Sequence, residues 1–353
     1  MSSSEQEGTS AAAEQLGRMS LGESGERKDN ETESTTSNGT TPTKLCSACG
    51  KKSDGLMKCR ACKCVWYCDK DCQNKHWKEH KKECRRIKKT LENRGGKLDL
   101  GTEMDVGPLE KLPPREECPI CMQTLPIHAG LHSYSVCCGK TICSACGFQH
   151  QLRSRELGET CAFCRTALSD SDEEILAQLR KRVERKDPEA LSNMGMCYDR
   201  GEYGLPVNQA KCLELLREAV DLGYPNAQYK LGAFYRFGEM GLEKNEEEGI
   251  KYWEKAAEGG HVPSRHDLGC IEDVKNGDHV AAMRHFRLAA SGGFKDSMEN
   301  LIQCFDYGFL HHGDLAETLQ AFYLSRAELK SKDRDEYIKY LKMTGKYEEE
   351  YDC

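Results

Sequence analysis

Residues 46–84 read CSACGKKSDGLMKCRACKCVWYCDKDCQNKHWKEHKKEC and decide the fold of the first half of the chain. The cysteines and one histidine of this stretch recur at the spacings C-x2-C, C-x2-C, C-x3-C and H-x3-C. A C-x2-C turn places two thiolates on one side of a metal ion, and a closed tetrahedral zinc site needs two such pairs. The stretch therefore predicts two zinc ions, with the expected ligands Cys46, Cys49, Cys59, Cys62, Cys68, Cys72, His80 and Cys84.

A second cysteine series fills residues 118–165, which read CPICMQTLPIHAGLHSYSVCCGKTICSACGFQHQLRSRELGETCAFCR. It also holds eight cysteines, most of them in C-x2-C pairs, and predicts two further zinc ions. We therefore expect four zinc ions in all. The expected ligands of the second series are Cys118, Cys121, Cys137, Cys138, Cys143, Cys146, Cys161 and Cys164.

A disulfide framework is the alternative explanation for so many cysteines, and the composition argues against it. Residues 1–44 carry no apolar signal-peptide core, and no run of the chain approaches membrane-spanning length. Five of the 21 cysteines lie outside the two series, and their spacing suggests no pairs. These features predict a cytoplasmic or nuclear protein that is not secreted and has no membrane partner, and in a reducing compartment such pairs indicate metal sites.

The 353 residues carry a formal charge of −7, and their composition changes sharply along the chain. Residues 1–44 contain 15 Ser and Thr and no aromatic residue, which predicts a disordered tail rich in Ser, Thr and Glu. Residues 85–117 are expected to form a basic helix and a linker. Between Lys75 and Lys97, ten Lys and Arg face three Glu, but no recognition-helix layout accompanies them. A solvated helix face is therefore favoured over a nucleic-acid partner.

The first cysteine series also carries Trp66-Tyr67 before Cys68, and Trp77 three residues before His80. With these residues, positions 45–84 resemble a MYND zinc finger. The resemblance implies a module without catalytic activity that binds a short proline-containing peptide. It also implies that Cys64 is a spare thiol beside the site and that His76 is an exposed helix residue. It also implies two interleaved ligand sets, Cys46, Cys49, Cys68 and Cys72 on one zinc and Cys59, Cys62, His80 and Cys84 on the other.

The second series, residues 118–165, resembles a RING finger of the all-cysteine kind. Lys140 stands where that family usually has a histidine, and the adjacent Cys137 and Cys138 restore the eighth ligand. Because neighbouring residues seldom bind one ion comfortably, His132 or His128 is an alternative fourth ligand. The resemblance implies the sets Cys118, Cys121, Cys143 and Cys146, and Cys137, Cys138, Cys161 and Cys164.

RING fingers hold a ubiquitin-charged conjugating enzyme, and the resemblance carries two contact positions to this chain. Ile120 would pack on that enzyme, and Arg165 would bridge it to ubiquitin. Two departures weaken the match: Ala162 replaces the usual proline, and no Trp lies between the sixth and seventh cysteines, so that Phe148 or Leu152 must supply its contact. Catalysis would be by proximity, with no nucleophile from this chain.

The second half of the chain repeats itself. Met194-Gly195, Leu231-Gly232 and Leu268-Gly269 recur in register, and a later Ala and Gly pair recurs after 37 and then 33 residues. Two-helix units of this period stack into a solenoid. Residues 188–294 resemble three Sel-1-like repeats, within a repeat region expected at residues 169–323 that ends in a cap. Asn245 and Glu248 predict a capping box at the start of the second helix of the middle repeat. A charged helix or tail is expected at residues 324–353.

The sequence thus predicts small zinc-stapled modules followed by an all-α solenoid of two-helix repeats, and the zinc modules and the solenoid are expected to keep separate cores joined by a polar linker. The functional hypothesis is a zinc-binding interaction scaffold that is also a candidate RING-type ubiquitin ligase, with an unidentified partner on the solenoid. The alternative is an adaptor that uses all three parts only for docking. A lysine methyltransferase is disfavoured, because the chain passes from Cys84 directly to another zinc module and then to helical repeats.

Overall fold

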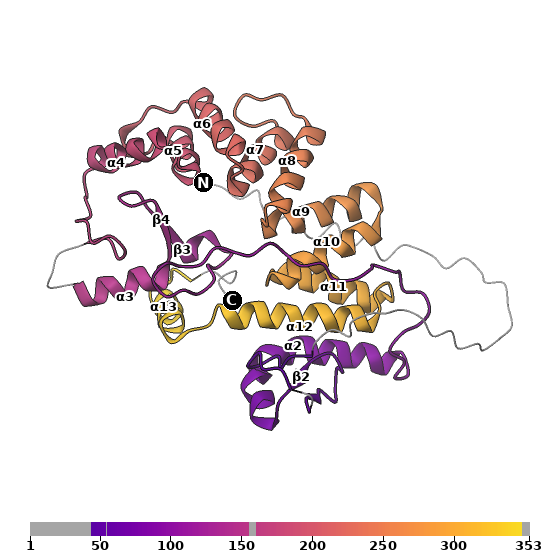
Figure 1. Cartoon of the computed structure of the whole chain (residues 1–353). Helices are drawn as coiled ribbons and strands as arrows, with labels where there is room; N and C mark the ends of the chain where they lie inside the picture. Colours follow the sequence, from indigo (N-terminus) through magenta and orange to yellow (C-terminus); the bar gives the residue numbers. More distant parts are fainter. Residues whose placement is uncertain (1–43, 54, 155–159, 348–353) are drawn as a thin grey trace.

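The computed structural model describes residues 44–53, 55–154 and 160–347 (Figure 1). The tail expected at residues 1–44 lies outside this range except for Lys44, and so does the end of the chain after residue 347. None of the helices in the described part of the chain is both long and apolar enough to span a bilayer.

The first module consists of a two-stranded ribbon and one long helix. Strands β1 (Met57–Lys58) and β2 (Trp66–Tyr67) pair antiparallel, with Met57 opposite Tyr67. Helix α2 (Lys70–Asn93) begins after Asp69, whose side chain accepts a hydrogen bond of 2.7 Å from the Cys72 backbone N–H. One stripe of α2 is buried, at spacings of three and four residues, and it consists of His76, His80, Cys84, Ile87, Thr90 and Leu91.

The second module is a hairpin followed by a helix. After the short 3-10 helix η2 (Ala129–Leu131), strand β3 (His132–Ser135) pairs antiparallel with β4 (Lys140–Cys143). Gly139 takes a φ of +67° in the turn between them, a conformation that a residue with a Cβ rarely adopts. Helix α3 (Ser144–Ser154) follows directly.

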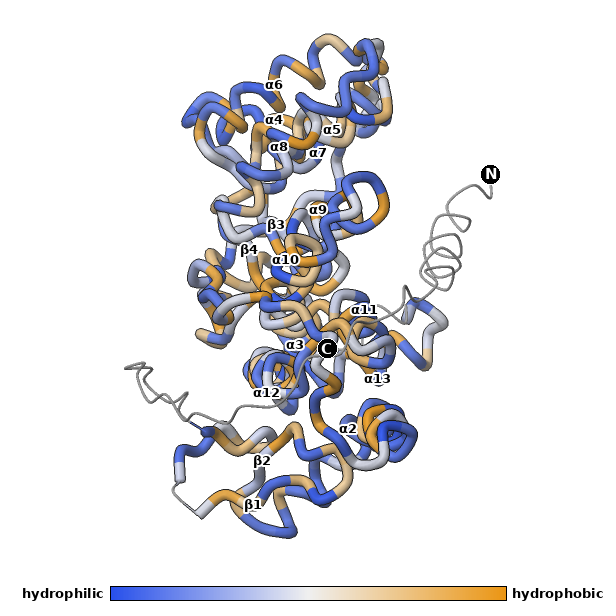
Figure 2. The backbone as a smooth tube through the Cα atoms, turned by 90° about the vertical axis from the view of Figure 1, so that its right-hand side faces the viewer, coloured by the Kyte–Doolittle hydropathy of each residue, from blue (hydrophilic) through white to orange (hydrophobic). Residues whose placement is uncertain are grey.

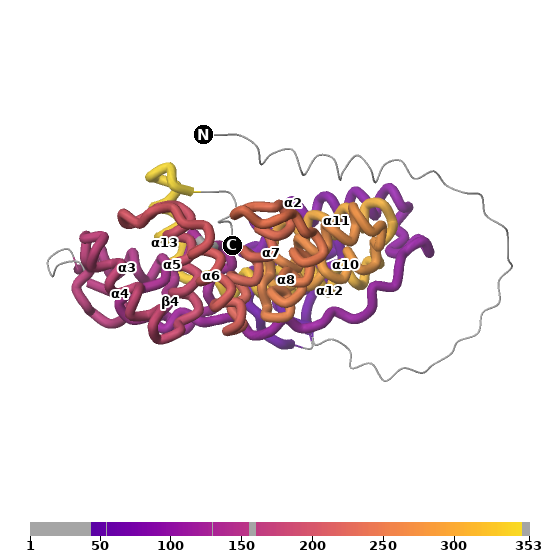
Figure 3. Tube along the Cα trace, turned by 90° about the horizontal axis from the view of Figure 1, so that it is seen from above, coloured from indigo at the N-terminus to yellow at the C-terminus, as the bar shows by residue number. Residues whose placement is uncertain are grey.

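The repeats form consecutive helices that stack along the long axis of the molecule, from α4 and α5 at one end to α10 and α11 at the other (Figure 3). Short 3-10 and π-helical turns, η3 (Glu202–Gly204) and η4 (Glu272–Asn276), interrupt the array. The α-helices are α4 (Asp172–Glu184), α5 (Pro188–Arg200), α6 (Gln209–Asp221), α7 (Pro225–Phe237), α8 (Glu246–Glu258), α9 (Val262–Ile271), α10 (His279–Ser291), α11 (Lys295–Tyr307), α12 (His312–Glu328) and α13 (Lys332–Met343).

The repeated sequence marks have clear structural roles. Asn245 caps α8 by accepting a hydrogen bond of 3.1 Å from the Glu248 backbone N–H, which is one half of the predicted capping box; the Asn245 N–H donates to the Tyr235 carbonyl at 2.7 Å and not to the Glu248 side chain. Gly232 lets α7 approach α8 closely, because a Cβ at this position would lie 2.5 Å from the Trp253 ring. A glycine at the same position of each repeat therefore allows the two helices of that repeat to pack closely.

The zinc modules and the repeats were expected to keep separate cores, and that expectation is wrong for the first module. One continuous core joins the inner face of α2 to α10, α11 and α12. Ile87, Phe305 and Tyr323 all belong to it and are almost fully buried. Figure 2 shows α2 and its ribbon at the end of the molecule opposite α4 and α6, so the finger covers the C-terminal end of the solenoid. The buried stripe of α2 extends past the short β-ribbon of the finger, so its apolar side chains pack on the repeats instead.

Ion pairs and a packed connection strengthen this contact. Arg86 of α2 bonds to Asp306 at 2.5 Å and also pairs with Glu299, so the basic helix face is partly docked on α11 and not wholly solvated. The connection at residues 98–117 follows the repeats closely, with the Val106 side chain buried and its carbonyl accepting from Arg284 at 3.1 Å.

The C-terminal boundary expected at residue 323 falls inside α12, which runs to Glu328. The helix continues because Ser325 and Leu329 extend its buried side. Helix α13 then turns back onto α3, where the Phe148 ring lies 4.6 Å from that of Tyr340.

The second module is also fixed to the first repeat, since Tyr134 donates a hydrogen bond of 2.6 Å to Asp187. With α3 beside α13, this module lies toward the α4 and α5 end of the repeat array (Figures 1 and 3).

Candidate functional site

The predicted ligands gather into four separate groups in the described structure. Within each group the ligand atoms all lie within 4.8 Å of one another, and each group offers four sulfur or nitrogen donors. This is the donor set and the count of a closed structural zinc site. The groups fit four zinc ions and are Cys46, Cys49, Cys68 and Cys72; Cys59, Cys62, His80 and Cys84; Cys118, Cys121, Cys143 and Cys146; and Cys137, Cys138, Cys161 and Cys164.

Each group contains one thiol with a depressed pKa. Burial opposes ionisation of Cys46, Cys118 and Cys164, but hydrogen bonds from their loops outweigh it and bring the pKa to about 7 for Cys46 and Cys118 and about 6 for Cys164. Hydrogen bonds from the side chains of Cys62 and Cys84 hold the pKa of Cys59 far below its usual range. Thiolate is the form that binds zinc, and one thiol of each group is favoured in that form, whereas two others in each group have raised pKa values.

The second group of the first module is buried on all sides. Cys62 Sγ lies 3.3 Å from His80 Nε2, and Cys59 Sγ lies 3.8 Å from Cys84 Sγ. Because Nε2 faces the sulfurs, the ring proton belongs on Nδ1, which donates to the Tyr323 hydroxyl at 3.2 Å. A hydrogen bond of this kind fixes the tautomer and orientation of a metal-binding histidine.

Helix α12 therefore contributes to the surroundings of this zinc group. Besides Tyr323, its residue His312 places Nε2 2.9 Å from the Cys62 carbonyl and 3.3 Å from Cys64 Sγ. Cys64 stands beside the group without belonging to it. The repeats thus hold the loop that carries Cys62.

The prediction that His76 is exposed is wrong. Its ring is buried, takes part in a hydrogen bond of 3.0 Å with the Tyr67 hydroxyl, and meets the Tyr323 ring edge-on at 4.2 Å between centroids. Burial lowers the pKa of His76 to about 3, so the ring is neutral. The cause is the packing of α12 over this face of α2, which the spacing of the ligands does not reveal.

In the second module, the adjacent Cys137 and Cys138 both enter one group. Cys164 Sγ lies 3.4 Å from Cys137 Sγ, and Cys138 Sγ lies 3.9 Å from Cys161 Sγ. The tight turn at Gly139, whose N–H donates to the Ser135 carbonyl at 2.8 Å, directs the two thiols into the same space. Neither His128 nor His132 belongs to the group, because both line a cavity instead.

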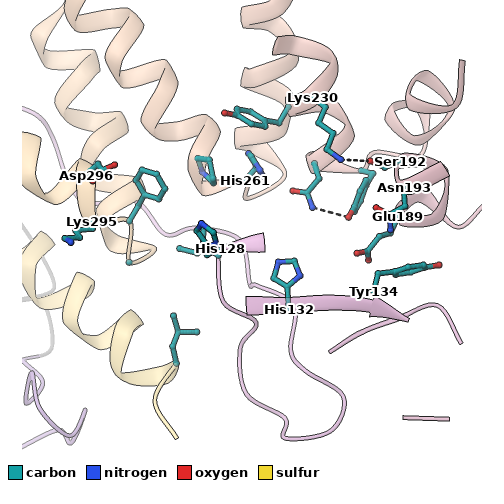
Figure 4. A pocket seen from close by; sticks show the side chains of 18 of the residues that line it. His128, His132, Tyr134, Glu189, Ser192, Asn193, Lys230, His261, Lys295 and Asp296 are labelled. Atoms are coloured by element: carbon teal, nitrogen blue, oxygen red, sulfur yellow. Dashed lines mark hydrogen bonds between the residues drawn. The ribbon is translucent and has the colours of Figure 1, made fainter. Parts of the chain in front are cut away.

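That cavity is the site that the sequence did not predict. It has a volume of about 840 Å³ and lies between β3 and the repeats (Figure 4). The second residue of each first helix in the repeats lines it, and these residues are Glu189, Asn226, Pro263 and Asp296. Because these residues occupy the same position in successive repeats, the repeat pattern in the sequence could have indicated that they line one surface.

Comparison with known proteins identifies two parts of the chain. The MYND finger family matches residues 46–84, and the Sel1 repeat family matches residues 188–224, 225–261 and 272–294. The chain contains a MYND zinc finger and Sel1 repeats. Together with the four metal-binding groups, these matches support a zinc-binding protein-interaction scaffold.

Similar proteins match only parts of the chain. Histone-lysine N-methyltransferase ASHR1 of Arabidopsis thaliana is 42% identical over 50 residues, which are 14% of this chain and 10% of that protein. Histone-lysine N-methyltransferase Smyd1 of Mus musculus is 44% identical over 45 residues, 13% of this chain and 9% of that protein. The chain thus spans about a tenth of the length of these relatives. A Sel1 repeat protein from Oxalobacter formigenes, of known structure, is 28% identical and covers 36% of this chain and 97% of its own, with a TM-score of 0.33.

The contact between α12 and the MYND finger generates a prediction. In Tyr323→Phe, the buried His80 Nδ1–H loses its acceptor, so we expect the zinc affinity of this group to fall by roughly 10- to 100-fold. Competition with a chromophoric zinc chelator measures the change. Tyr198→Phe, a partly buried tyrosine of α5, is the matched control. Competition curves that coincide for both variants and the wild type would show that α12 does not support the site.

Proposed function

We propose that the protein is an adaptor whose MYND finger captures a short proline-containing peptide while the repeats hold that finger in a fixed orientation. The observation that carries the proposal is the asymmetry of the finger. One face of α2 is sealed against α11 and α12, whereas Trp77 on the same helix keeps 40% of its surface exposed. The side of α2 that carries Trp77 is therefore accessible to a ligand.

The exposed residues suit a proline-containing ligand. Met57 of β1 is 44% exposed, and the Trp66 ring is only partly buried, with Lys44 Nζ 4.5 Å and Lys58 Nζ 5.2 Å from its centre. Proline-rich segments dock on surfaces lined by aromatic rings, since their extended helix loses little entropy on binding. The two lysines also keep Trp66 in place through cation–π contacts.

A peptide array tests this function. Decapeptides with one to three prolines in otherwise randomised sequence are screened against the zinc-loaded chain, and binders are measured by fluorescence anisotropy. We expect Trp77→Ala to weaken them at least tenfold without loss of zinc, because the indole supplies the docking surface. Tyr307→Ala, at a similarly exposed aromatic residue of α11, is the control. Absence of proline-dependent binders, or equal binding by both variants, would exclude the proposal.

A second candidate function is recruitment of a ubiquitin-conjugating enzyme by the second zinc module, and three exposed side chains favour it. Ile120 is 40% exposed, and Leu152 of α3 is 43% exposed. Phe148 is committed to α13, where its ring meets Tyr337 and Tyr340, so Leu152 is the residue left to supply the helix contact.

Arg165 is exposed on the last zinc loop of the same module. Its φ of +63° and a hydrogen bond of 2.7 Å from its Nη1 to His150 Nδ1 hold the guanidinium beside α3. In this candidate function, the guanidinium would leave His150 to contact ubiquitin.

Discharge of charged conjugating enzymes tests the second candidate. Ile120→Ala should weaken recruitment, because an apolar contact is lost, whereas Arg165→Ala should slow ubiquitin discharge and leave recruitment nearly unchanged. Val207→Ala and Arg153→Ala, at exposed positions outside the zinc loops, are the matched controls. All variants should retain zinc. If the wild type discharges no enzyme of a broad panel, or if both loop variants act like the wild type, the module serves docking alone.

A further inference from the structure

The cavity between the second zinc module and the repeats contains a lysine that lacks an anionic partner. The side chain of Lys230 on α7 points into the cavity (Figure 4). Among the described residues, the only hydrogen bond of its ammonium group is a long one of 3.4 Å to the Ser192 hydroxyl. No carboxylate of the described residues lies within 4.0 Å of its ammonium group. Since an ammonium group has three donors, two remain for a ligand.

The charges around Lys230 leave the cavity positive. Lys295 and Arg326 also line it, and neither forms an ion pair among the described residues. Of the two lining carboxylates, Glu189 is buried, and burial raises its pKa to about 7, so a large fraction of it is neutral near neutral pH. Asp296 is the other. In a chain of net charge −7, this pocket therefore favours an anion.

Two further polar side chains that face the cavity could form hydrogen bonds with a ligand. The Asn193 side chain and the His132 ring make no hydrogen bond within the described residues, although both face the cavity. A neutral imidazole ring has one hydrogen-bond donor and one acceptor. Such groups, placed in a partly enclosed space, provide orientation for a ligand.

The shape of the cavity indicates an extended ligand. It runs along the first helices of successive repeats, from Glu189 on α5 to Asp296 on α11, and the strand β3 closes its other side (Figure 4). Aromatic rings line it between these ends, with Tyr229 and His261 4.7 Å apart and Phe294 beyond them. Alternating polar and aromatic groups suit the backbone and side chains of a peptide.

We propose that this cavity is a second peptide-binding site, whose ligand places a carboxylate at Lys230, Ser192 and Asn193 and extends along the repeats toward Lys295. The carboxylate is either the C-terminus of the peptide or an acidic side chain, since both offer the same two oxygens. The site does not depend on the peptide proposed for the MYND finger, because it is built from different elements.

Selection from a peptide library tests the proposal. Random heptapeptides with free C-termini, displayed on phage, are selected on the full-length zinc-loaded chain. Enriched peptides are then synthesised as free acids, as C-terminal amides, and with Asp and Glu replaced by Asn and Gln. Fluorescence anisotropy measures their affinity for the wild type, for Lys230→Gln and Asn193→Leu, and for Lys251→Gln, an exposed lysine of α8 outside the cavity. Trp77→Ala separates this site from the MYND finger.

We expect enriched peptides whose binding falls at least tenfold in Lys230→Gln and in one of the two carboxylate-free forms, but not in Lys251→Gln or Trp77→Ala. The amide and the Asn or Gln form identify which carboxylate is bound. Asn193→Leu, which leaves Lys230 in place, should weaken the same peptides and guards against a folding defect in Lys230→Gln. The proposal fails if no peptide is enriched, if binding does not require a carboxylate, or if Lys230→Gln and Asn193→Leu bind as the wild type does.

Discussion

The hydrogen bond from His80 to Tyr323 joins the zinc chemistry of the chain to its repeats. His80 belongs to a fully buried ligand group of the MYND finger, and Tyr323 belongs to α12, more than two hundred residues later in the chain. A zinc finger of this size has too little core to fold without metal, and structural zinc contributes on the order of 10 to 16 kcal/mol of apparent binding free energy. Because the finger shares its core with α10, α11 and α12, part of that free energy also stabilises the C-terminal repeats.

The second zinc module contacts both the first repeat and α13, the helix that follows the repeats. Its hairpin bonds to α5 through Tyr134 and Asp187, and its helix α3 packs on α13 through Phe148. These contacts hold β3 across the first helices of the repeats and so form the cavity around Lys230. Zinc in this module thus supports a cavity that is lined by none of the zinc ligands.

The division of the metal ligands into four groups was implied by the resemblance to two finger families, whereas the ligands themselves could be predicted, because ligand spacing is a local property and a C-x2-C turn needs only a few residues. The cap at Asn245 was predictable for the same reason. The burial of His76 and the shared core were not, since they depend on contacts between α2 and α12 that no local pattern encodes. Adjacent residues rarely bind one ion, so the roles of Cys137 and Cys138 could not be decided from spacing; the turn at Gly139 directs both thiols into one group.

Hydrogen exchange with and without zinc tests the central claim most directly, namely that zinc stabilises the C-terminal repeats through the MYND finger. The full chain is compared before and after chelation, with α8 as an internal reference, because the core around its Trp253 contains no residue of either zinc module. We predict that amide protection in α11 and α12 falls by at least tenfold on zinc removal while protection in α8 changes little. Equal protection of α11 and α12 in both states would contradict the account.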